Sequence, residues 1–222
     1  MVNIVIFGSG DHAKIVFSEI IKLKKYKILG FVDNFKKKGT RVIKYFNKNY
    51  YTIGNIKNVV RKKNNFRGII ASGLNFKREK IYNDIVKINK KFKFEKIISK
   101  NTIIDSSVHI GDGTLIVSGT VINHGTKIGN HCIINSSCSI DHDNNLDDFS
   151  SVGPGVITGG NVKLGKNSFI GIGSVVIHNV KINDETVIGA KSLVNKNCKK
   201  NSVYYGSPIK RIGSRKKFDS YL

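Results

Sequence analysis

The chain has few cysteines and no long apolar segment. Its three cysteines are Cys132, Cys138 and Cys198, and we expect them to be buried packing residues in a reducing compartment rather than disulfide partners or nucleophiles. No segment reaches the length of a transmembrane helix, and the N-terminus has neither the basic start nor the apolar core of a signal peptide. We therefore expect a cytoplasmic protein with no membrane insertion.

Acidic residues are also scarce. Asp and Glu number 15 against 38 Lys and Arg, so the formal net charge is +23. Such a charge can indicate nucleic acid as a partner, but the lysines are scattered along the whole chain and no helix-turn-helix, zinc-finger or RNP-type motif accompanies them. We therefore expect no nucleic acid partner, and a positive field that favours anionic small ligands such as nucleotide diphosphates and coenzyme A.

The second half of the chain has a period of six residues. An aliphatic residue occupies every sixth position, and Thr158 is the one exception. The positions are Ile104, Ile110, Ile116, Ile122, Ile128, Ile134, Ile140, Leu146, Val152, Thr158, Leu164, Ile170, Val176, Ile182, Ile188 and Val194. This period matches neither an α-helix nor simple strand alternation, so it predicts a coil in which each hexapeptide forms one short face.

A second regularity supports the first. Four residues after each aliphatic position stands a small or β-branched residue, and only Asn144 departs from this pattern. Large aliphatic side chains can fill the interior of a triangular prism, while small ones let the chain turn beside them. We predict a parallel β-helix of roughly five coils. The pattern resembles that of the hexapeptide-repeat acyltransferases, which implies coils that wind left-handed.

The first hundred residues indicate a different fold. A β-branched run at 2–7 leads into Gly8-Ser9-Gly10-Asp11-His12-Ala13 and a helical pattern at 14–25, and a second strand at 27–32 ends at Asp33-Asn34. This order is typical of a mononucleotide-binding unit, with phosphate at the helix N-terminus. Because Ala13 replaces the third glycine of a dinucleotide fingerprint, the motif supports NAD only weakly and is equally compatible with a nucleotide sugar.

Three further elements complete the first part: a short helix at 55–63, a buried strand at 68–73 and a helix at 75–87. They predict a small open α/β sheet, and no proline-rich or glycine-rich linker separates it from the coil, so the two parts should pack firmly. The expected organisation is a Rossmann-like domain at 1–96, a left-handed β-helix at 97–200 and a C-terminal tail at 201–222.

One column of the predicted coil carries the candidate chemistry. Three hexapeptides return the chain to the same corner, one layer up at about 4.8 Å, so His124, His142, Gly160 and His178 share a column. An imidazole can remove a proton from an alcohol or an ammonium near neutral pH, and a carboxylate beside it raises its basicity. Gly160 leaves room for a substrate group beside the His142 ring, and this arrangement suits acyl transfer.

Two points about the histidines stay open. His142 lies between Asp141 and Asp143, and the sequence leaves undecided which carboxylate contacts the ring. Histidines at coil corners are common surface residues, so His109, His131 and His178 have no assigned role.

The combined motifs resemble the sugar O-acyltransferases of the NeuD type, together with the PglD-type and PerB-type nucleotide-sugar N-acetyltransferases. The resemblance spans nearly the whole chain. The segments that carry it are Ile6-Phe7-Gly8-Ser9-Gly10-Asp11-His12-Ala13, Gly30-Phe31-Val32-Asp33-Asn34, Ile70-Ala71-Ser72-Gly73 with Arg78, Asn135, Asp141-His142-Asp143 and Tyr205-Gly206-Ser207-Pro208-Ile209-Lys210.

The resemblance implies roles for individual residues. His142 matches the general base, Asp143 the acid that increases its basicity, and Asn135 a residue near the acceptor nitrogen. The positions implied to hold the nucleotide sugar are Gly10, Asp11, His12, Asp33, Asn34, Ser72 and Gly73. The positions implied to contact acetyl-CoA are Ser151, Gly160, Ile172 and Ala190, with the Gly160 amide directed at the thioester carbonyl.

Four positions depart from the family pattern. Asp11 replaces a usual glycine, Ser151 a histidine, Ala190 a glycine, and Asp143 stands where PglD-type enzymes carry a glutamate. The resemblance further implies a homotrimer with the active site between subunits, acetyl-CoA as co-substrate, and no metal.

The leading hypothesis is therefore transfer of an acetyl group from acetyl-CoA to the 4-amino group of a nucleotide-activated amino-deoxy sugar. A close alternative is O-acetylation of a sialic-acid-like sugar, since an imidazole base serves both nucleophiles. More remote alternatives are a γ-type carbonic anhydrase with histidine-bound zinc and a non-catalytic β-helix scaffold. The nucleotide, the sugar and the glycan pathway are not specified by the sequence.

Overall fold

A computed structural model describes residues 1–61, 65–216 and 218–221 of the chain. They form two compact units, one of Met1–Gly73 with Lys77–Ile97 and the other of Leu74–Phe76 with Ile98–Leu222. The prediction of an N-terminal α/β domain followed by a parallel β-helix is confirmed. Among the described helices, none is long and apolar enough to cross a membrane.

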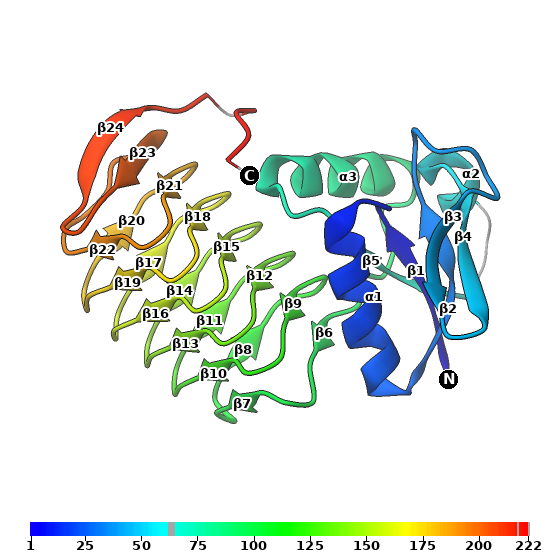
Figure 1. Ribbon diagram of the computed structural model, residues 1–222, viewed down its shortest axis with the longest axis horizontal. Coiled ribbons are helices and arrows are strands. Elements are labelled where there is room, and N and C mark those ends of the chain that lie inside the picture. The colour runs from blue at the N-terminus through cyan, green and yellow to red at the C-terminus, as the bar shows by residue number, and fades with distance from the viewer. Residues whose placement is uncertain (62–64, 217, 222) are drawn as a thin grey trace. The chain divides into compact units, whose positions relative to one another are not determined.

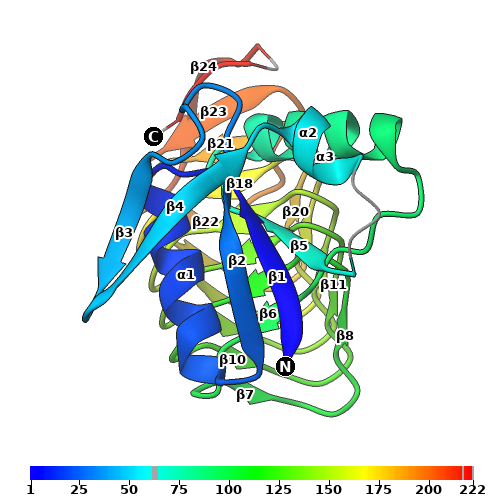
Figure 2. The same cartoon turned by 90° about the vertical axis from the view of Figure 1, so that its right-hand side faces the viewer.

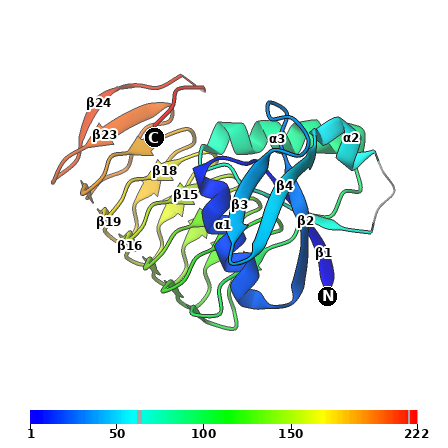
Figure 3. The ribbon, with the colours of Figure 1, turned by 45° about the vertical axis from the view of Figure 1, so that its right-hand side comes forward.

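The first unit contains an open, mostly parallel sheet. Its elements are β1 (Val2–Phe7), α1 (Asp11–Leu23), β2 (Tyr26–Val32), β3 (Arg41–Tyr45), β4 (Lys48–Gly54), α2 (Ile56–Val60), β5 (Arg67–Ile70) and α3 (Asn75–Ile88), the last of which begins in the second unit. The strand order is β3-β4-β2-β1-β5, with β1 parallel to both neighbours (Figure 2). Figure 3 shows the antiparallel pair β3 and β4 beside β2. Residues 42–50 are polar and aromatic, and no strand was predicted there from the sequence.

Successive residues of these strands pack into different layers. Val5 and Phe7 of β1 lie in a core cluster with Ile85 of α3 and with the buried residues of α2. Phe31 of β2 instead stacks on Phe17 of α1, with ring centroids 6.2 Å apart. The alternation of strand side chains thus places helices on both faces of the sheet.

The second unit is a prism of parallel coils with three faces (Figure 1). The first face has β6 (Ile97–Ile98), β9 (Leu115–Ile116), β12 (Ile133–Ile134), β15 (Ser151–Val152), β18 (Phe169–Ile170) and β21 (Val187–Ile188), and continues into β23 (Ser202–Tyr205) and β24 (Lys210–Ser214). The second face has β7 (Ile103–Ile104), β10 (Val121–Ile122), β13 (Ser139–Ile140), β16 (Ile157–Thr158), β19 (Val175–Val176) and β22 (Leu193–Val194). The third face has β8 (His109–Ile110), β11 (Lys127–Ile128), β14 (Asn145–Leu146), β17 (Lys163–Leu164) and β20 (Lys181–Ile182).

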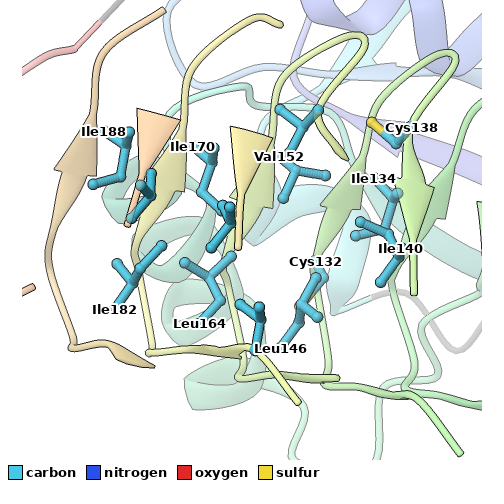
Figure 4. Packing of buried hydrophobic residues seen from close by; sticks show 14 of the residues in the cluster. Cys132, Ile134, Cys138, Ile140, Leu146, Val152, Leu164, Ile170, Ile182 and Ile188 are labelled. Atoms are coloured by element: carbon cyan, nitrogen blue, oxygen red, sulfur yellow. The ribbon is translucent and has the colours of Figure 1, made fainter. Parts of the chain in front are cut away.

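Strand pairing follows the predicted step of eighteen residues. On the second face Ile122 pairs with Ile140, and Ile140 with Thr158. The repeated aliphatic side chains point into the prism, as Figure 4 shows for Ile134, Ile140 and Leu146. Their burial away from water, at roughly 25 cal/mol per Å² of apolar area, makes this column the main stabilising contribution of the unit.

The small interior residues have a second use that the sequence pattern did not reveal. The Thr126 hydroxyl donates to the carbonyl of Asp141 at 2.8 Å and accepts from the amide of Asn144 at 3.2 Å. Ser168 makes the equivalent pair of bonds to Asn183 and Thr186. A hydroxyl here satisfies backbone groups that would otherwise be buried without a partner at the turn.

A left-handed residue closes each turn. From position 113 to 191, every sixth residue, three after the aliphatic one, has a positive φ. Glycine occupies several of these positions, but others hold Asp143 (φ 55°), Asn161 (φ 59°) and Asn179 (φ 62°). Asn and Asp tolerate this conformation better than most side chains. The repeat therefore determines which residues must adopt the left-handed conformation, and Asp143 is one of them.

Candidate active site

His142 is positioned by its two acidic neighbours in different ways. Its ring Nδ1 lies 2.9 Å from Oδ2 of Asp143, whereas its backbone N–H donates to Oδ1 of Asp141 at 2.8 Å. Asp141 is held in turn by the Asn123 amide, which donates to the same Oδ1 at 3.0 Å. The question that the sequence left open is thus resolved: Asp143 contacts the ring, and Asp141 holds the backbone.

The Asp143 contact makes the imidazole more basic. The hydrogen bond to Asp143 has the largest effect on the pKa of His142 and raises it; desolvation, the next largest effect, opposes it, and the charges of Asp141 and Asp143 raise the pKa further. With Nδ1 donating to Asp143, the lone pair lies on Nε2. Nε2 is therefore the atom able to accept a proton from a substrate.

Gly160 lies directly above this ring. A Cβ added at Gly160 would come within 2.5 Å of both Cε1 and Nε2 of His142, so a side chain there would collide with the imidazole. The Gly160 carbonyl accepts a bond from Asn179, while within the described residues its amide donates to no acceptor. An unpaired N–H next to Nε2 is suited to bind a developing oxyanion.

The two residues that break the sequence repeat support this turn. The Thr158 hydroxyl accepts the amide of Asp141 at 3.2 Å. The buried Asn144 side chain donates to the carbonyls of Asp141 at 2.6 Å and Gly159 at 3.1 Å, and accepts from the amide of Val162 at 3.1 Å. The sequence showed that Thr158 and Asn144 break the repeat, but it did not show that they support the turn of His142. A polar residue at an interior position of the repeat was the feature that could have indicated this role.

One coil below His142, a second histidine makes polar contacts. Nδ1 of the exposed His124 lies 3.0 Å from the Ser107 hydroxyl and 3.4 Å from Asp105, and Ser107 donates to Asp105. In the described part of the chain, no group of three or more His, Cys, Asp or Glu side chains is arranged to hold a metal ion. The column thus carries two histidines, each with a carboxylate close to its Nδ1.

The structure divides the predicted β-helix residues between two corners. His142, Asp143 and Gly160 lie where the second face turns into the third, which we call the His142 corner. Asn135, with Ile172 and Ala190 of higher coils, lies where the first face turns into the second, which we call the Asn135 corner. Within one chain Asn135 is therefore not beside His142, and its Oδ1 accepts the amide of Ser136 at 2.9 Å.

The predicted coenzyme contacts differ in accessibility. Ile172 and Ala190 are both exposed at the Asn135 corner. Ser151 is only 3% exposed, and its hydroxyl donates to Asn75 at 2.7 Å. The Ser151 side chain is thus buried and paired within the chain, and a coenzyme contact at this position stays a prediction.

In the first unit, the glycine turn comes close to the neighbouring strand. Gly8 has a φ of 115°, and a Cβ there would lie 2.8 Å from the carbonyl oxygen of Ala71. Gly10 is the N-cap of α1 without a side-chain cap, so the first amides of the helix are directed outward. Asp11 is exposed and pairs with Lys14 at 2.8 Å. The turn is accordingly open on the side where an anion would bind.

His12 is half-buried although it stands beside the glycine turn. Burial, followed by the positive charge of Arg78, lowers the pKa of His12 to about 4, so its ring is neutral near pH 7. Its Nε2 is buried and has no hydrogen-bond partner among the described residues. Arg78 also binds the predicted loop, since it donates to the carbonyls of Ser72 at 2.9 Å and Gly73 at 3.4 Å.

Asp33 and Asn34 line a pocket of about 600 Å³ at the end of β2, together with Lys36, Lys37, Lys38 and Arg61. Asp33 accepts the hydroxyl of Ser9 and the amides of Phe35 and Lys36. Burial would raise the pKa of Asp33, but these hydrogen bonds together hold it below its ordinary value. The Asn34 side chain accepts the first amide of α2 at 3.1 Å. Both residues shape a basic pocket of nucleotide size.

Comparison with known proteins finds a family match in each half of the chain. Residues 3–85 match the PglD N-terminal domain, and residues 161–196 match the bacterial transferase hexapeptide (six repeats). The first unit is thus similar to the PglD N-terminal domain, and the coil carries the hexapeptide repeats found in bacterial transferases. The recognition made from the sequence motifs is thereby confirmed.

Solved structures show the same fold. A His-to-Asn variant of perosamine N-acetyltransferase from Caulobacter crescentus, in complex with CoA and GDP-perosamine, is 26% identical, with 96% of this chain and 97% of that chain covered and a TM-score of 0.85. The acetyltransferase domain of PglB from Neisseria gonorrhoeae FA1090, in complex with acetyl coenzyme A, is 23% identical over 95% and 98% of the two chains, with a TM-score of 0.84. WeeI from Acinetobacter baumannii AYE is 20% identical over 96% and 100%, with a TM-score of 0.80. No curated protein sequence matches the chain significantly.

Proposed function

We propose that the protein transfers an acetyl group from acetyl-CoA to the 4-amino group of a nucleotide-activated amino-deoxy sugar. The observation that carries the proposal is the Asp143–His142 pair, whose ring lies against Gly160, a residue with a free backbone amide. The similarity to a perosamine N-acetyltransferase at 26% identity supports an amino sugar as the acceptor.

In the proposed reaction, His142 Nε2 takes a proton from the sugar amine as the nitrogen attacks the thioester carbonyl carbon. The C–N bond forms, and the Gly160 amide stabilises the negative oxygen of the tetrahedral intermediate. Collapse breaks the C–S bond, and the protonated His142 returns its proton to the leaving thiolate. The products are the N-acetylated sugar and CoA.

The cysteines favour this direct route over an acyl-enzyme. Cys132, Cys138 and Cys198 are all buried in the prism. Burial raises the pKa of Cys138 to about 11 and that of Cys198 to about 12. Both thiols are therefore protonated near pH 7 and are poor nucleophiles.

The exposed residues of the second face support a homotrimer as part of this proposal. The outward side chains there include Ile103, Ile157 and Val175, which are 72%, 49% and 39% exposed. The outward residues of the third face are instead polar, and include Lys127 and Asn145. An apolar face of a prism beside a polar one is typical of a surface that is covered by another subunit.

The same face explains how two separate corners could form one site. The second face is bordered by the Asn135 corner on one side and the His142 corner on the other. If the second faces of neighbouring copies pack against one another around a closed ring, the Asn135 corner of one copy approaches the His142 corner of the next. A site with His142, Asn135, Ile172 and Ala190 would then be completed only between subunits.

The basic pocket of the first unit supports an acceptor that carries a nucleotide. Lys36, Lys37, Lys38 and Arg61 line it beside Asp33, and a cluster of cations attracts a diphosphate.

The test is acetyl transfer by the wild-type protein and by H142N, measured as thiol release with acetyl-CoA and a panel of UDP-, GDP- and dTDP-linked 4-amino sugars. We expect N-acetylated product with the wild type and a loss of about a hundredfold or more in kcat for H142N, the range of general base catalysis. H109A, which removes another exposed histidine, should retain full activity. Acetylation of hydroxyl groups in free nonulosonic acids, with no reaction of the amino sugars, would refute the proposal.

A further inference from the structure

The amine of the proposed acceptor brings one proton more than His142 accepts. An amine flanked by electron-withdrawing groups, such as an α-amino group, has a pKa of about 7.7–8.0, so at pH 7 it is mostly an ammonium ion. An ammonium ion has no lone pair. It must lose one proton before its nitrogen attacks a thioester, and a second proton as the C–N bond forms. In the proposed reaction His142 takes the second proton and returns it to the thiolate, so the first proton needs another acceptor.

His124 is a candidate for that acceptor because of its place in the prism. It lies one coil below His142 in the same column, and neighbouring coils are about 4.8 Å apart. The His124 carbonyl accepts the amide of Asp143 at 2.9 Å, so the turn of the upper histidine is built directly on the turn of the lower one. The side chain of His124 is 75% exposed. A proton taken by this ring can therefore leave to water without passing through His142.

The contacts of Ser107 determine which ring nitrogen of His124 carries a proton. The Ser107 hydroxyl donates to Oδ1 of Asp105 at 2.6 Å and accepts the amide of Gly125 at 2.8 Å. Because a hydroxyl has a single proton, Nδ1 of His124, which lies 3.0 Å from the same oxygen, must be the donor. The lone pair of the neutral ring then lies on Nε2, as it does in His142. Within the described part of the chain, no hydrogen bond occupies this Nε2.

Carboxylates next to His124 supply negative charge for a cationic acceptor. Oδ1 of Asp105 lies 3.4 Å from Nδ1 of His124. Hydrogen bonds from Ser107 lower the pKa of Asp105, so this carboxylate is charged near pH 7. The other titratable groups next to His124 are on the coil above, and they are Asp141, His142 and Asp143. An ammonium group is thus attracted to the side of the column where its proton would be removed.

We propose that His124 is a second catalytic base, which converts the ammonium form of the acceptor into the amine that then reacts at His142. This inference rests on the proposed function, because only an amino acceptor brings the extra proton. Nε2 of His124 takes the proton from the ammonium group, which leaves a neutral amine and an imidazolium beside Asp105. The imidazolium passes the proton to water, and the lone pair of the amine attacks the thioester carbon. In sum, the protonated amine and acetyl-CoA give the amide, the CoA thiol and one proton in water.

The test compares the wild type with H124N across pH. The measured quantity is kcat/KM with the preferred 4-amino sugar at pH 7 and at pH 9.5. Without His124 the enzyme depends on acceptor that is already neutral in solution, which at pH 7 is roughly a tenth to a sixth of an amine with a pKa of about 7.7–8.0. We expect H124N to lose about five- to tenfold in kcat/KM at pH 7 and to match the wild type at pH 9.5, where the amine is neutral.

The matched control is H109N, because His109 is an exposed histidine of β8 outside this column. It should equal the wild type at both pH values. An H124N loss of the same size at pH 7 and pH 9.5 would indicate a structural role and overturn the inference, as would the absence of a loss at pH 7, and both results leave the proposed reaction intact. A wild type that acetylates only hydroxyl groups, or no sugar at all, would refute the proposed reaction and this inference together.

Discussion

The conformation of Asp143 determines what His142 can do. A left-handed φ of 55° turns the carboxylate of Asp143 back toward the ring of the preceding residue, where it reaches Nδ1 at 2.9 Å. Two glycines make this possible: a Cβ at Gly125 would meet the Asp143 carboxylate, and one at Gly160 would meet the His142 ring. The Asp–His pair thus depends on a conformation that the six-residue repeat imposes at this position.

The first prediction at this scale concerns pH. Asp143 is the main cause of the raised pKa of His142, and a general base works only when it is deprotonated. In D143N the pKa of His142 falls, so the acidic limb of the kcat/KM profile moves to lower pH while the plateau rate decreases, because the weaker base accepts the proton less readily. The profile with the preferred amino sugar measures both effects.

D112N is the control for this experiment, since Asp112 is exposed elsewhere on the prism. It should reproduce the wild-type profile. A D143N profile with an unchanged midpoint would show that Asp143 does not act through the ring. A shift in the opposite direction would contradict the assignment of His142 as the base.

At the scale of the element, the coil that carries His142 is held by polar residues at interior positions. At the interior position of this corner, the neighbouring coils have the small or β-branched residues Thr126 and Val162, whereas the coil of His142 has Asn144. The Asn144 side chain forms hydrogen bonds with backbone groups of its own coil and of the next one. Such buried bonds replace apolar packing and fix the backbone of the turn in one geometry.

This arrangement predicts a large effect of N144A. The substitution leaves the carbonyl of Gly159 and the amide of Val162 without their Asn144 partner, while the carbonyl of Asp141 keeps the Thr126 hydroxyl. An unsatisfied buried polar group costs about 1–3 kcal/mol. We expect the free energy of unfolding to fall by at least that amount, as measured by urea denaturation, together with a loss of activity. N145A, in which the removed side chain is exposed on the third face, should change stability by less than about 0.5 kcal/mol.

For the whole molecule, the division of the site between two corners has a direct consequence. If the His142 corner of one subunit works with the Asn135 corner of the next, two inactive variants can restore each other. In an equimolar mixed trimer of H142A and N135A, about a quarter of the interfaces combine an intact His142 with an intact Asn135. We expect co-expressed variants to show activity near that fraction of the wild type, while each variant alone is inactive or nearly so.

A mixture of H142A and D143N is the control, because both substitutions lie in the same corner and no interface of these two variants combines an intact His142 with an intact Asp143. It should show no more activity than its D143N component supplies. Equal behaviour of the two mixtures would refute a site shared between subunits. Light scattering establishes in parallel whether the wild type is a trimer.

The sequence predicted some features of this site well and others not at all. The step of eighteen placed His142 below Gly160, because a repeat with no insertions converts sequence spacing directly into height along the prism. It could not choose between Asp141 and Asp143, since that choice depends on the backbone dihedral of one residue. It also gave no sign that the Ser151 hydroxyl donates to Asn75.

In the first unit, too, the sequence predicted local features but not those that depend on tertiary contacts. The glycine turn and the strand ending at Asp33 were predicted from composition, because β-branched runs and glycines are local signals. The hairpin of β3 and β4 was not, since its residues form a strand only through pairing with each other and with β2. The burial that lowers the pKa of His12 likewise comes from packing, and no local pattern reports it.

The sequence alone therefore determined the architecture and the chemical type of this protein: a nucleotide-type α/β domain, a β-helix, and a histidine with acids beside it. These features follow from periodicity and from neighbours in the chain, which are local. Tertiary structure alone decided which acid contacts the ring, that Thr158 and Asn144 hold the turn, and that the predicted contacts occupy two corners of one apolar face. These depend on dihedral angles and on residues brought together from different coils, which no linear spacing encodes.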